Sequence, residues 1–243
     1  MIDQRQHVVD IVLGGRELQL QVSDTVFQPT LTTRLLAQAV RIPTRSAVLD
    51  LGCGVGALAI FAALLGAEYV DAVDVMPEAR QLVQDNAKRN GVADRVTATT
   101  GDIYSSIGDK KYDVIISDVS GVVDEVSRLS PWYPDSIPTG GYDGADQIVK
   151  MLEHAPAHLN PGGVLYYPTG TISSTSRTLA AAQLAFGDNI EIVEQIEVPF
   201  CQEFKDNMDV MTRLQSEGLI EFTTRRSRHL WTLQIYRCWL STN

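Results

Sequence analysis

The chain has 243 residues, of which 44% are hydrophobic and 21% are charged. This composition excludes wholesale disorder and predicts one large domain, with or without a small appendage. Thirty acidic residues against 20 basic ones give a net charge of -10. The resulting negative field disfavours loose electrostatic capture of nucleic acid or of an anionic membrane.

Three further features concern location and metals. The chain has no apolar run of about 18 residues and no basic start followed by an apolar run, so we expect neither a membrane span nor a signal peptide. Its three cysteines, Cys53, Cys201 and Cys238, are widely spaced and form no Cys-x-x-Cys pair. This argues against a disulfide framework and a metal site, and a reduced, cytoplasmic location is expected.

The hydrophobic pattern of the first half alternates between strands and helices. An alternating run around Gly14 and Gly15 predicts a hairpin over residues 7–22. Short apolar runs at 47–51, 69–75, 95–100 and 112–117 predict buried strands. Helical spacing is found at 31–40, 57–67 and 77–91, and the last of these begins at a proline and ends at Asn-Gly.

The second half continues this alternation and then changes character. We expect helices at 145–159 and 173–186 around a strand at 162–168, then a strand at 190–198 and a helix at 201–218. Residues 219–224 and 229–239 look like two final strands. Strands that alternate with helices predict an α/β fold with a mostly parallel sheet covered by helices on both faces.

Two segments are longer than such a scaffold needs. We expect a hairpin appendage at 1–24 and one domain at 25–243, in which a loop at 118–144 and a helical insertion at about 200–217 cover the substrate. Long loops in compact domains are usually functional, which is the reason for this interpretation.

The strongest local pattern is VLDLGCGVG, residues 48–56, between a predicted strand and a predicted helix. Gly52, Gly54 and Gly56 allow a ligand to approach the backbone closely. Gly52, Gly54 and Ala57 also satisfy the dinucleotide pattern G-x-G-x-x-G/A, with Asp74 placed to hold a ribose. The glycines alone therefore leave a dehydrogenase possible.

Asp50 favours a different ligand. It lies two residues before Gly52, where a pyrophosphate would meet a carboxylate and be repelled. S-adenosylmethionine instead carries an ammonium and a sulfonium, together with a ribose for Asp74. Asp102 ends the next predicted strand, where its carboxylate can accept a hydrogen bond from an adenine amino group. Three acids at three successive strand ends thus predict an S-adenosylmethionine site.

Over about residues 25–170 the chain resembles the class I S-adenosylmethionine-dependent methyltransferases. VLDLGCGVG, AVDVMPEA and TGDIY are similar to the first three motifs of that family. The resemblance implies a Rossmann-like seven-stranded sheet whose last strand is antiparallel. It also implies that S-adenosylmethionine contacts Thr33, Asp50, Gly52, Cys53, Gly54, Gly56, Asp74, Val75, Asp102, Ile103 and Asp118.

Within this class the chain is most similar in pattern to the release-factor glutamine methyltransferases. VFQPTLTTRLL, which contains Thr33, and the segment 138–167 resemble theirs. Where those enzymes have Asn-Pro-Pro-Tyr, which clamps a planar amide, this chain has Asp118, Val119, Ser120 and Gly121. The loss of this clamp favours a different acceptor, and we expect a small molecule such as an amine or a guanidine.

Candidate acceptor-side residues follow from the same comparison. Asp118 is the expected catalytic residue, because a carboxylate at this strand end can orient or deprotonate an acceptor. Ser120, Trp132, Tyr133 and Tyr142 lie in the long loop after it and are candidate substrate contacts.

Two other functions stay open at this level. A protein or RNA substrate would use the long loops and the basic cluster of Arg225, Arg226, Arg228 and His229 as its docking surface. A non-catalytic S-adenosylmethionine-binding module would keep the glycine loop without any chemistry. The sequence leaves the oligomeric state undetermined.

Overall fold

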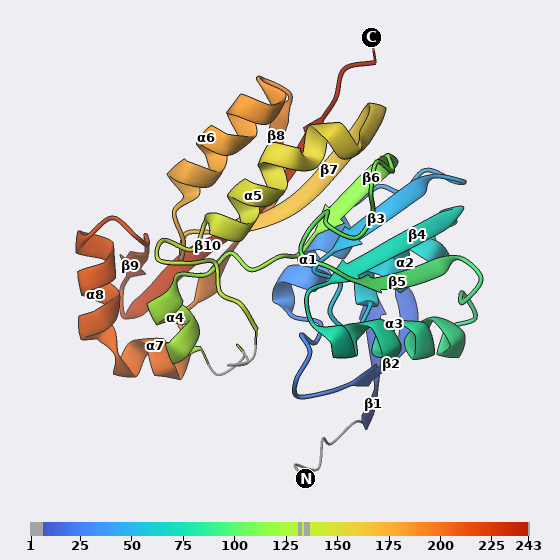
Figure 1. Ribbon diagram of the computed structural model, residues 1–243. Helices are drawn as coiled ribbons and strands as arrows, with labels where there is room; N and C mark the ends of the chain where they lie inside the picture. Colours follow the sequence, from blue (N-terminus) through green and yellow to red (C-terminus); the bar gives the residue numbers. More distant parts are fainter. Residues whose placement is uncertain (1–6, 131–132, 134–136, 243) are drawn as a thin grey trace.

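The computed structural model describes residues 7–130, 133 and 137–242. Its centre is one twisted sheet in which seven strands lie side by side (Figure 1). Their order across the sheet is β5 (Val96–Thr100), β4 (Tyr69–Asp74), β3 (Ala47–Leu51), β6 (Tyr112–Ser117), β7 (Leu159–Gly170), β10 (Arg228–Trp239) and β8 (Ile190–Pro199).

The strand directions confirm the predicted fold class. Strands β5, β4, β3, β6 and β7 pair in parallel, whereas β10 is antiparallel to both β7 and β8. A short strand β9 (Thr223–Arg225) pairs with β10 and adds an eighth member. The strand expected at 219–224 is wrong except at its end, since residues 219–222 form no ladder.

Helices cover both faces of the sheet. One face carries α1 (Leu31–Ala39), α2 (Ala57–Leu64) and α3 (Pro77–Arg89), and the other carries α5 (Asp146–His154), a 3₁₀ turn η1 (Ala155–His158) and α6 (Thr175–Phe186). The helix expected at 145–159 therefore stops early, because Pro156 has no N–H for an α-helical bond and the chain tightens into the 3₁₀ turn. Helix α2 is buried along nearly its whole length, which explains its almost purely apolar sequence.

The N-terminal hairpin packs on the helix layer. Strands β1 (His7–Leu13) and β2 (Arg16–Val22) pair antiparallel, and the inward side of β2 joins the core beneath α2 and α3. The buried amide of Asn86 in α3 accepts a hydrogen bond from the backbone N–H of Gln21 at 2.6 Å. It donates to the carbonyls of Gln21 and Val55, both at 2.9 Å. One side chain therefore links the hairpin to the glycine loop.

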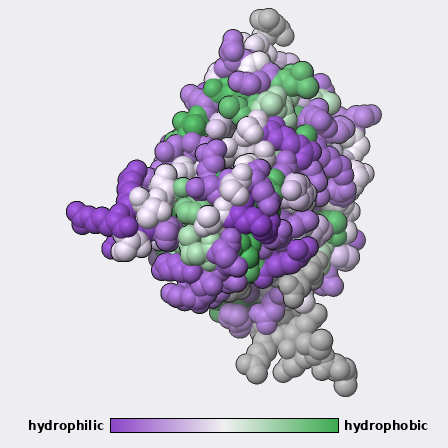
Figure 2. All heavy atoms as spheres, turned by 90° about the vertical axis from the view of Figure 1, so that its left-hand side faces the viewer, coloured by the Kyte–Doolittle hydropathy of each residue, from purple (hydrophilic) through white to green (hydrophobic). Residues whose placement is uncertain are grey.

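A third hydrophobic cluster, besides those on the two faces of the sheet, lies beyond the carboxyl ends of β6 and β7. It contains α4 (Asp124–Leu129), α7 (Gln202–Asp206) and α8 (Met208–Ser216), which bury Val126, Phe204, Met211 and Leu214. The helix expected at 201–218 is two helices, because the backbone of Asn207 leaves the helical conformation between them. The outer surface on this side of the molecule is mostly hydrophilic (Figure 2).

No helix in the described part of the chain is long and apolar enough to cross a membrane.

Candidate active site

Two adjoining cavities open at the carboxyl ends of the parallel strands. The strand-end cavity is lined by the residues that follow β4 and β5, namely Asp74, Val75, Gly101, Asp102 and Ile103, and by Ile137, Pro138 and Gln147. The inner cavity lies on the other side of Gly52, between α1, the glycine loop and β10. Both cavities are lined by Phe27, Gly52, Asp118, Val119 and Ser120. Ligands in the two cavities would therefore meet at Asp118.

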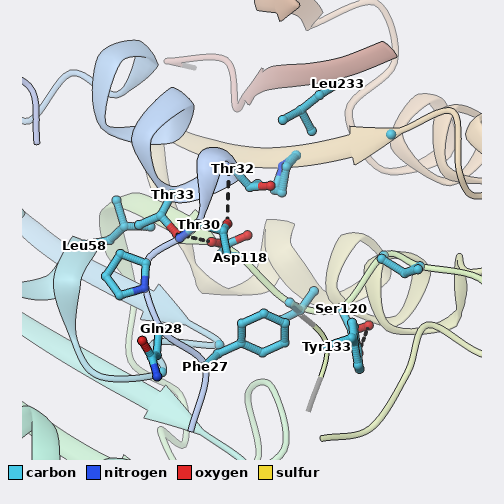
Figure 3. A pocket seen from close by; sticks show the side chains of 18 of the residues that line it. Phe27, Gln28, Thr30, Thr32, Thr33, Leu58, Asp118, Ser120, Tyr133 and Leu233 are labelled. Carbon is cyan, nitrogen blue, oxygen red and sulfur yellow. Dashed lines mark hydrogen bonds between the residues drawn. The ribbon is translucent and has the colours of Figure 1, made fainter. Parts of the chain in front are cut away.

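Asp118 is held in place by α1. Its Oδ2 accepts a hydrogen bond from Thr33 Oγ1 at 3.1 Å (Figure 3). The same Thr33 hydroxyl accepts from the backbone N–H of Thr30 at 3.1 Å, as part of a capping box at the start of α1. Displacement of water around the carboxyl raises the pKa of Asp118 to about 6, and the Thr33 bond offsets part of that rise. Asp118 is thus largely ionised at neutral pH.

Asp50 lies beneath the glycine loop and does not line either cavity. Its carboxyl is fully buried, and neither oxygen accepts a well-formed hydrogen bond from the described residues. Burial raises the pKa of Asp50 to about 8, the charge of Asp118 adds to this, and the backbone of Ala59 partly offsets it. An unpartnered buried carboxyl is costly, so this site gains free energy from a cation nearby.

Asp74 organises the loop as well as lining the strand-end cavity. It accepts hydrogen bonds from the backbone N–H groups of Gly54 at 2.8 Å and Met76 at 2.9 Å. Burial raises the pKa of Asp74, and these backbone donors oppose the rise. The residue predicted to hold a ribose therefore also fixes the position of the glycine loop.

Two glycines of the glycine loop allow other segments of the backbone to approach the loop closely. At Gly54, where φ is +52°, an added Cβ would lie 2.5 Å from the carbonyl oxygen of Phe27. At Gly52, with φ +71°, it would lie 3.1 Å from the carbonyl oxygen of Asp118. These close approaches bring the Phe27 segment and the end of β6 against the loop, so the glycines build both cavities before any ligand binds. At Gly56 an added Cβ would instead meet the side chain of Val83 in α3.

The remaining predicted cofactor residues surround the strand-end cavity or the loop. Ile103 is almost buried, with φ +53°, and Val75 is exposed. Asp102 is half-exposed and forms an ion pair with Lys150 of α5 at 2.5 Å, a partner that no sequence pattern indicates. Cys53 is buried beside the inner cavity, and burial raises the pKa of its thiol. It fits a small packing residue.

The structure separates the predicted acceptor-side residues. Ser120 and Tyr133 both line the inner cavity, and their hydroxyls are hydrogen-bonded at 2.5 Å (Figure 3). The Tyr133 hydroxyl also donates to the carbonyl of Pro138 at 2.7 Å. Tyr142 is 69% exposed and lines neither cavity, because its loop turns away before α5. Trp132 lies outside the described residues.

Sequence reasoning missed Phe27 and Trp231. Phe27 lines both cavities and packs edge-on against Tyr133, with ring centroids 5.3 Å apart. Phe27 belongs to the same VFQPTLTTRLL segment as Thr33, and this was a usable signal. Trp231 and Leu233 of β10 reach the inner cavity from the far end of the chain, and no local pattern indicates this.

Comparison with known proteins agrees with this architecture. The family model "Ribosomal protein L11 methyltransferase (PrmA)" matches residues 29–142. A release factor glutamine methyltransferase of Geobacter sulfurreducens is 32% identical over 177 residues, which cover 68% of this chain and 62% of the relative. A ribosomal protein uL3 glutamine methyltransferase of Bradyrhizobium diazoefficiens is 38% identical over 128 residues, 51% of this chain and 40% of the relative. The chain thus spans less than two thirds of these relatives.

A third relative and one solved structure extend the comparison. A putative protein N5-glutamine methyltransferase of Methanocaldococcus jannaschii is 25% identical over 75% of this chain and 91% of the relative. The T. thermophilus 16S rRNA N2 G1207 methyltransferase, solved with AdoMet and guanosine, superposes with a TM-score of 0.63 at 15% identity. It covers 97% of this chain and 50% of that one, and at this identity it shows the fold alone.

The predicted resemblance is confirmed: the fold is that of the class I methyltransferases, and the sequence matches are to methyltransferases. Within that class its sequence is similar to the release-factor glutamine methyltransferase group.

The predicted small-molecule acceptor, and with it a role in small-molecule metabolism, is wrong. The sequence relatives are named for protein substrates: release factors, ribosomal protein uL3 and ribosomal protein L11. The loss of the Asn-Pro-Pro-Tyr clamp does not imply a change from a macromolecular to a metabolite substrate. Physically it removes only a preference for a planar amide and says nothing about the size of the molecule that carries the acceptor.

Proposed function

We propose that this protein transfers a methyl group from S-adenosylmethionine to a nitrogen atom of a protein substrate. One observation carries the proposal: Asp50, Asp74 and Asp118 surround the glycine loop, and no Lys, Arg or His is among the described residues that line either cavity. The relatives named as protein methyltransferases support the choice of substrate.

The residues present fit S-adenosylmethionine by charge. Burial raises the pKa of Asp50, and a sulfonium or an ammonium bound nearby would favour its ionised form. Asp74 would hold the ribose, Asp102 the adenine amino group, and the backbone between Gly52 and Gly54 the methionine portion. A dinucleotide fits worse, because its pyrophosphate would face the same carboxylates. When bound, S-adenosylmethionine supplies an electrophilic methyl group.

Asp118 would act on the acceptor. It lies where the two cavities meet, and its ionised carboxylate can accept a hydrogen bond and then a proton from an acceptor N–H. Thr33 positions this carboxylate through its hydrogen bond. Because Asp118 replaces the amide-binding asparagine of the similar enzymes, a cationic amine suits this site better than a carboxamide. Such an amine gives a proton to the carboxylate, and its freed lone pair then forms the N–CH₃ bond as the S–CH₃ bond breaks.

The segments 118–144 and 200–217 would cover the acceptor. Tyr133, from the first, lines the inner cavity, and Phe204, from the second, packs in the same hydrophobic cluster as Tyr133. The basic cluster is a weaker candidate for contact, because Arg225 is paired with Glu197 at 2.7 Å. A cytoplasmic location, where ribosomal substrates are made, stays a prediction.

A methyl-transfer assay tests the proposal. The protein would be incubated with methyl-deuterated S-adenosylmethionine and a mixture of purified ribosomal proteins and release factors, then analysed by intact-mass and peptide mass spectrometry. We expect a deuterated methyl group on a nitrogen of one protein, and labelling about 10²–10⁴-fold slower with Asp118→Asn. S-adenosylmethionine binding without transfer to any protein would favour the non-catalytic binding module.

A further inference from the structure

A third, larger cavity continues outward from the inner one. This outer groove has a volume of about 700 Å³, against about 110 Å³ for the inner cavity. Its walls come from five segments: the stretch before and at the start of α1, Tyr133 of loop 118–144, the end of β8, the start of α7, and β10. The residues that line the outer groove but not the inner cavity are Asp24, Val26, Leu31, Val198, Pro199, Cys201 and Phe204.

The two cavities are continuous. Phe27, Tyr133, Trp231 and Leu233 line both, and so does the polar stretch 28–30 with Thr32. The inner cavity then reaches Asp118. A volume of several hundred Å³ is typical of sites that enclose a ligand of many atoms, far more than one acceptor group needs. The groove therefore has room for the part of a substrate that surrounds its methyl-accepting side chain.

The chemistry of the groove restricts its occupant. Its wall is mostly apolar, with Leu31, Pro199 and Phe204 on facing segments. The charged side chains among the described residues that line the groove and the inner cavity are both acidic: Asp24 in the groove and Asp118 at the inner end. Nucleic acid would bring phosphates to two carboxylates without a cation to pair them. An extended polypeptide with an apolar residue beside a basic one complements this surface.

We propose that the outer groove binds an extended segment of the protein substrate. An apolar side chain of that segment lies against Leu31, Pro199 and Phe204, while the neighbouring methyl-accepting side chain, a cationic amine, enters the inner cavity toward Asp118. This rests on the proposed function for the identity of the substrate. The insertion that carries Phe204 follows β8 directly and forms one side of this groove.

Peptide binding tests the groove independently of catalysis. Two fluorescein-labelled heptapeptide pools, each with a central lysine, would be titrated into the S-adenosylhomocysteine-saturated protein and followed by anisotropy. One pool has Ala, Leu, Phe and Ser mixed at the flanking positions, and the other has only Gly and Ser. We expect the apolar pool to bind at least tenfold more tightly.

Two perturbations test whether the peptide binds in the outer groove. Leu31 is 47% exposed in the groove, and Leu184 is 86% exposed on α6, so the pair Leu31→Gln and Leu184→Gln makes the same change at two solvent-accessible sites. We expect about fivefold weaker binding for Leu31→Gln and no change for Leu184→Gln. N-ethylmaleimide should block binding through Cys201, because Cys53 and Cys238 are buried, and Cys201→Ser should be insensitive to it.

Several results would overturn the groove assignment. These are equal binding of the two pools, absence of binding to the wild type, or binding that neither Leu31→Gln nor the thiol reagent weakens. A wild-type dimer that Leu31→Gln dissociates would assign the groove to a second copy of this chain instead. Normal peptide binding with no methyl transfer to any peptide or protein would leave the groove standing and refute the proposed function.

Discussion

The two halves of the sheet's carboxyl edge are built differently. After β4 and β5 the chain turns at once into a helix or a short turn, and Asp74 and Asp102 lie directly at those turns. After β6 and β8 the chain runs through loop 118–144 and through α7 and α8 before it returns to the sheet. The first half contains the motifs that resemble those of the class I methyltransferases. The second half contains the segments in which this chain differs from them.

We propose that this difference separates a cofactor side from an acceptor side. Most of the strand-end cavity is lined by residues at the carboxyl ends of the neighbouring parallel strands β3 to β6, and Asp74 ties the glycine loop to β4. The inner cavity and outer groove collect residues from Phe27 to Leu233, almost the whole length of the chain. Asp118 lies on the boundary. Changes on the cofactor side should therefore alter affinity for S-adenosylmethionine, and changes on the acceptor side should alter turnover.

The largest effect is expected for Asp118→Asn. The substitution keeps the shape of the side chain and removes its ability to take a proton, so turnover should fall by about 10²–10⁴-fold. Affinity for S-adenosylmethionine should change far less, and the unfolding midpoint should stay near that of the wild type. Full activity would contradict a role of Asp118 in the reaction. Asp118 would then be only a structural partner of Thr33, and the boundary between the cofactor side and the acceptor side would lie elsewhere.

The next largest effect is expected for Asp74→Ala. Loss of the ribose contact and of the bond to Gly54 N should weaken S-adenosylmethionine binding by about 1–3 kcal/mol, measured by calorimetry. Asp94→Ala, at an exposed acid before the amino end of β5 that lines none of the three cavities, is the matched control and should bind normally. Equal affinity of both variants would remove Asp74 from the cofactor site.

The pH dependence of cofactor binding should report on Asp50. With a pKa of about 8 in the free protein, this carboxyl is protonated at pH 6, and a bound cation favours its ionised form. Binding then releases a proton, so affinity for S-adenosylmethionine should rise about tenfold from pH 6 to pH 8 and level off above. S-adenosylhomocysteine, which lacks the sulfonium, should show a smaller rise. A pH-dependent affinity that persists in Asp50→Asn would contradict this assignment.

The smallest effect is expected for Thr33→Val. Without the Thr33 hydroxyl the pKa of Asp118 rises, so the acidic limb of the turnover profile should move to higher pH. Half of the capping box is also lost, at a cost of about 1 kcal/mol of stability. Thr30→Val removes the cap but not the bond to Asp118, so it should lower stability without moving the limb. Identical pH profiles for both variants would show that Thr33 acts on the helix alone.

The cofactor side was largely predictable because its residues obey local rules. Gly52, Gly54 and Asp74 follow buried strands, and parallel strands bring their carboxyl ends to one edge. The acceptor side was not, because Trp231 enters the cavity only through the antiparallel pairing of β10 with β7. The sequence also did not reveal the full role of Gly54, since its close neighbour is the Phe27 carbonyl, 27 residues earlier in the chain.

The central claim is that these carboxylates and glycines hold S-adenosylmethionine. Calorimetric titration of the wild-type protein with S-adenosylmethionine, and in parallel with a nicotinamide dinucleotide, tests it most directly. The account predicts low-micromolar binding of S-adenosylmethionine, about -7 to -8 kcal/mol, and no heat from the dinucleotide. Binding of the dinucleotide alone, or of neither ligand, would contradict it.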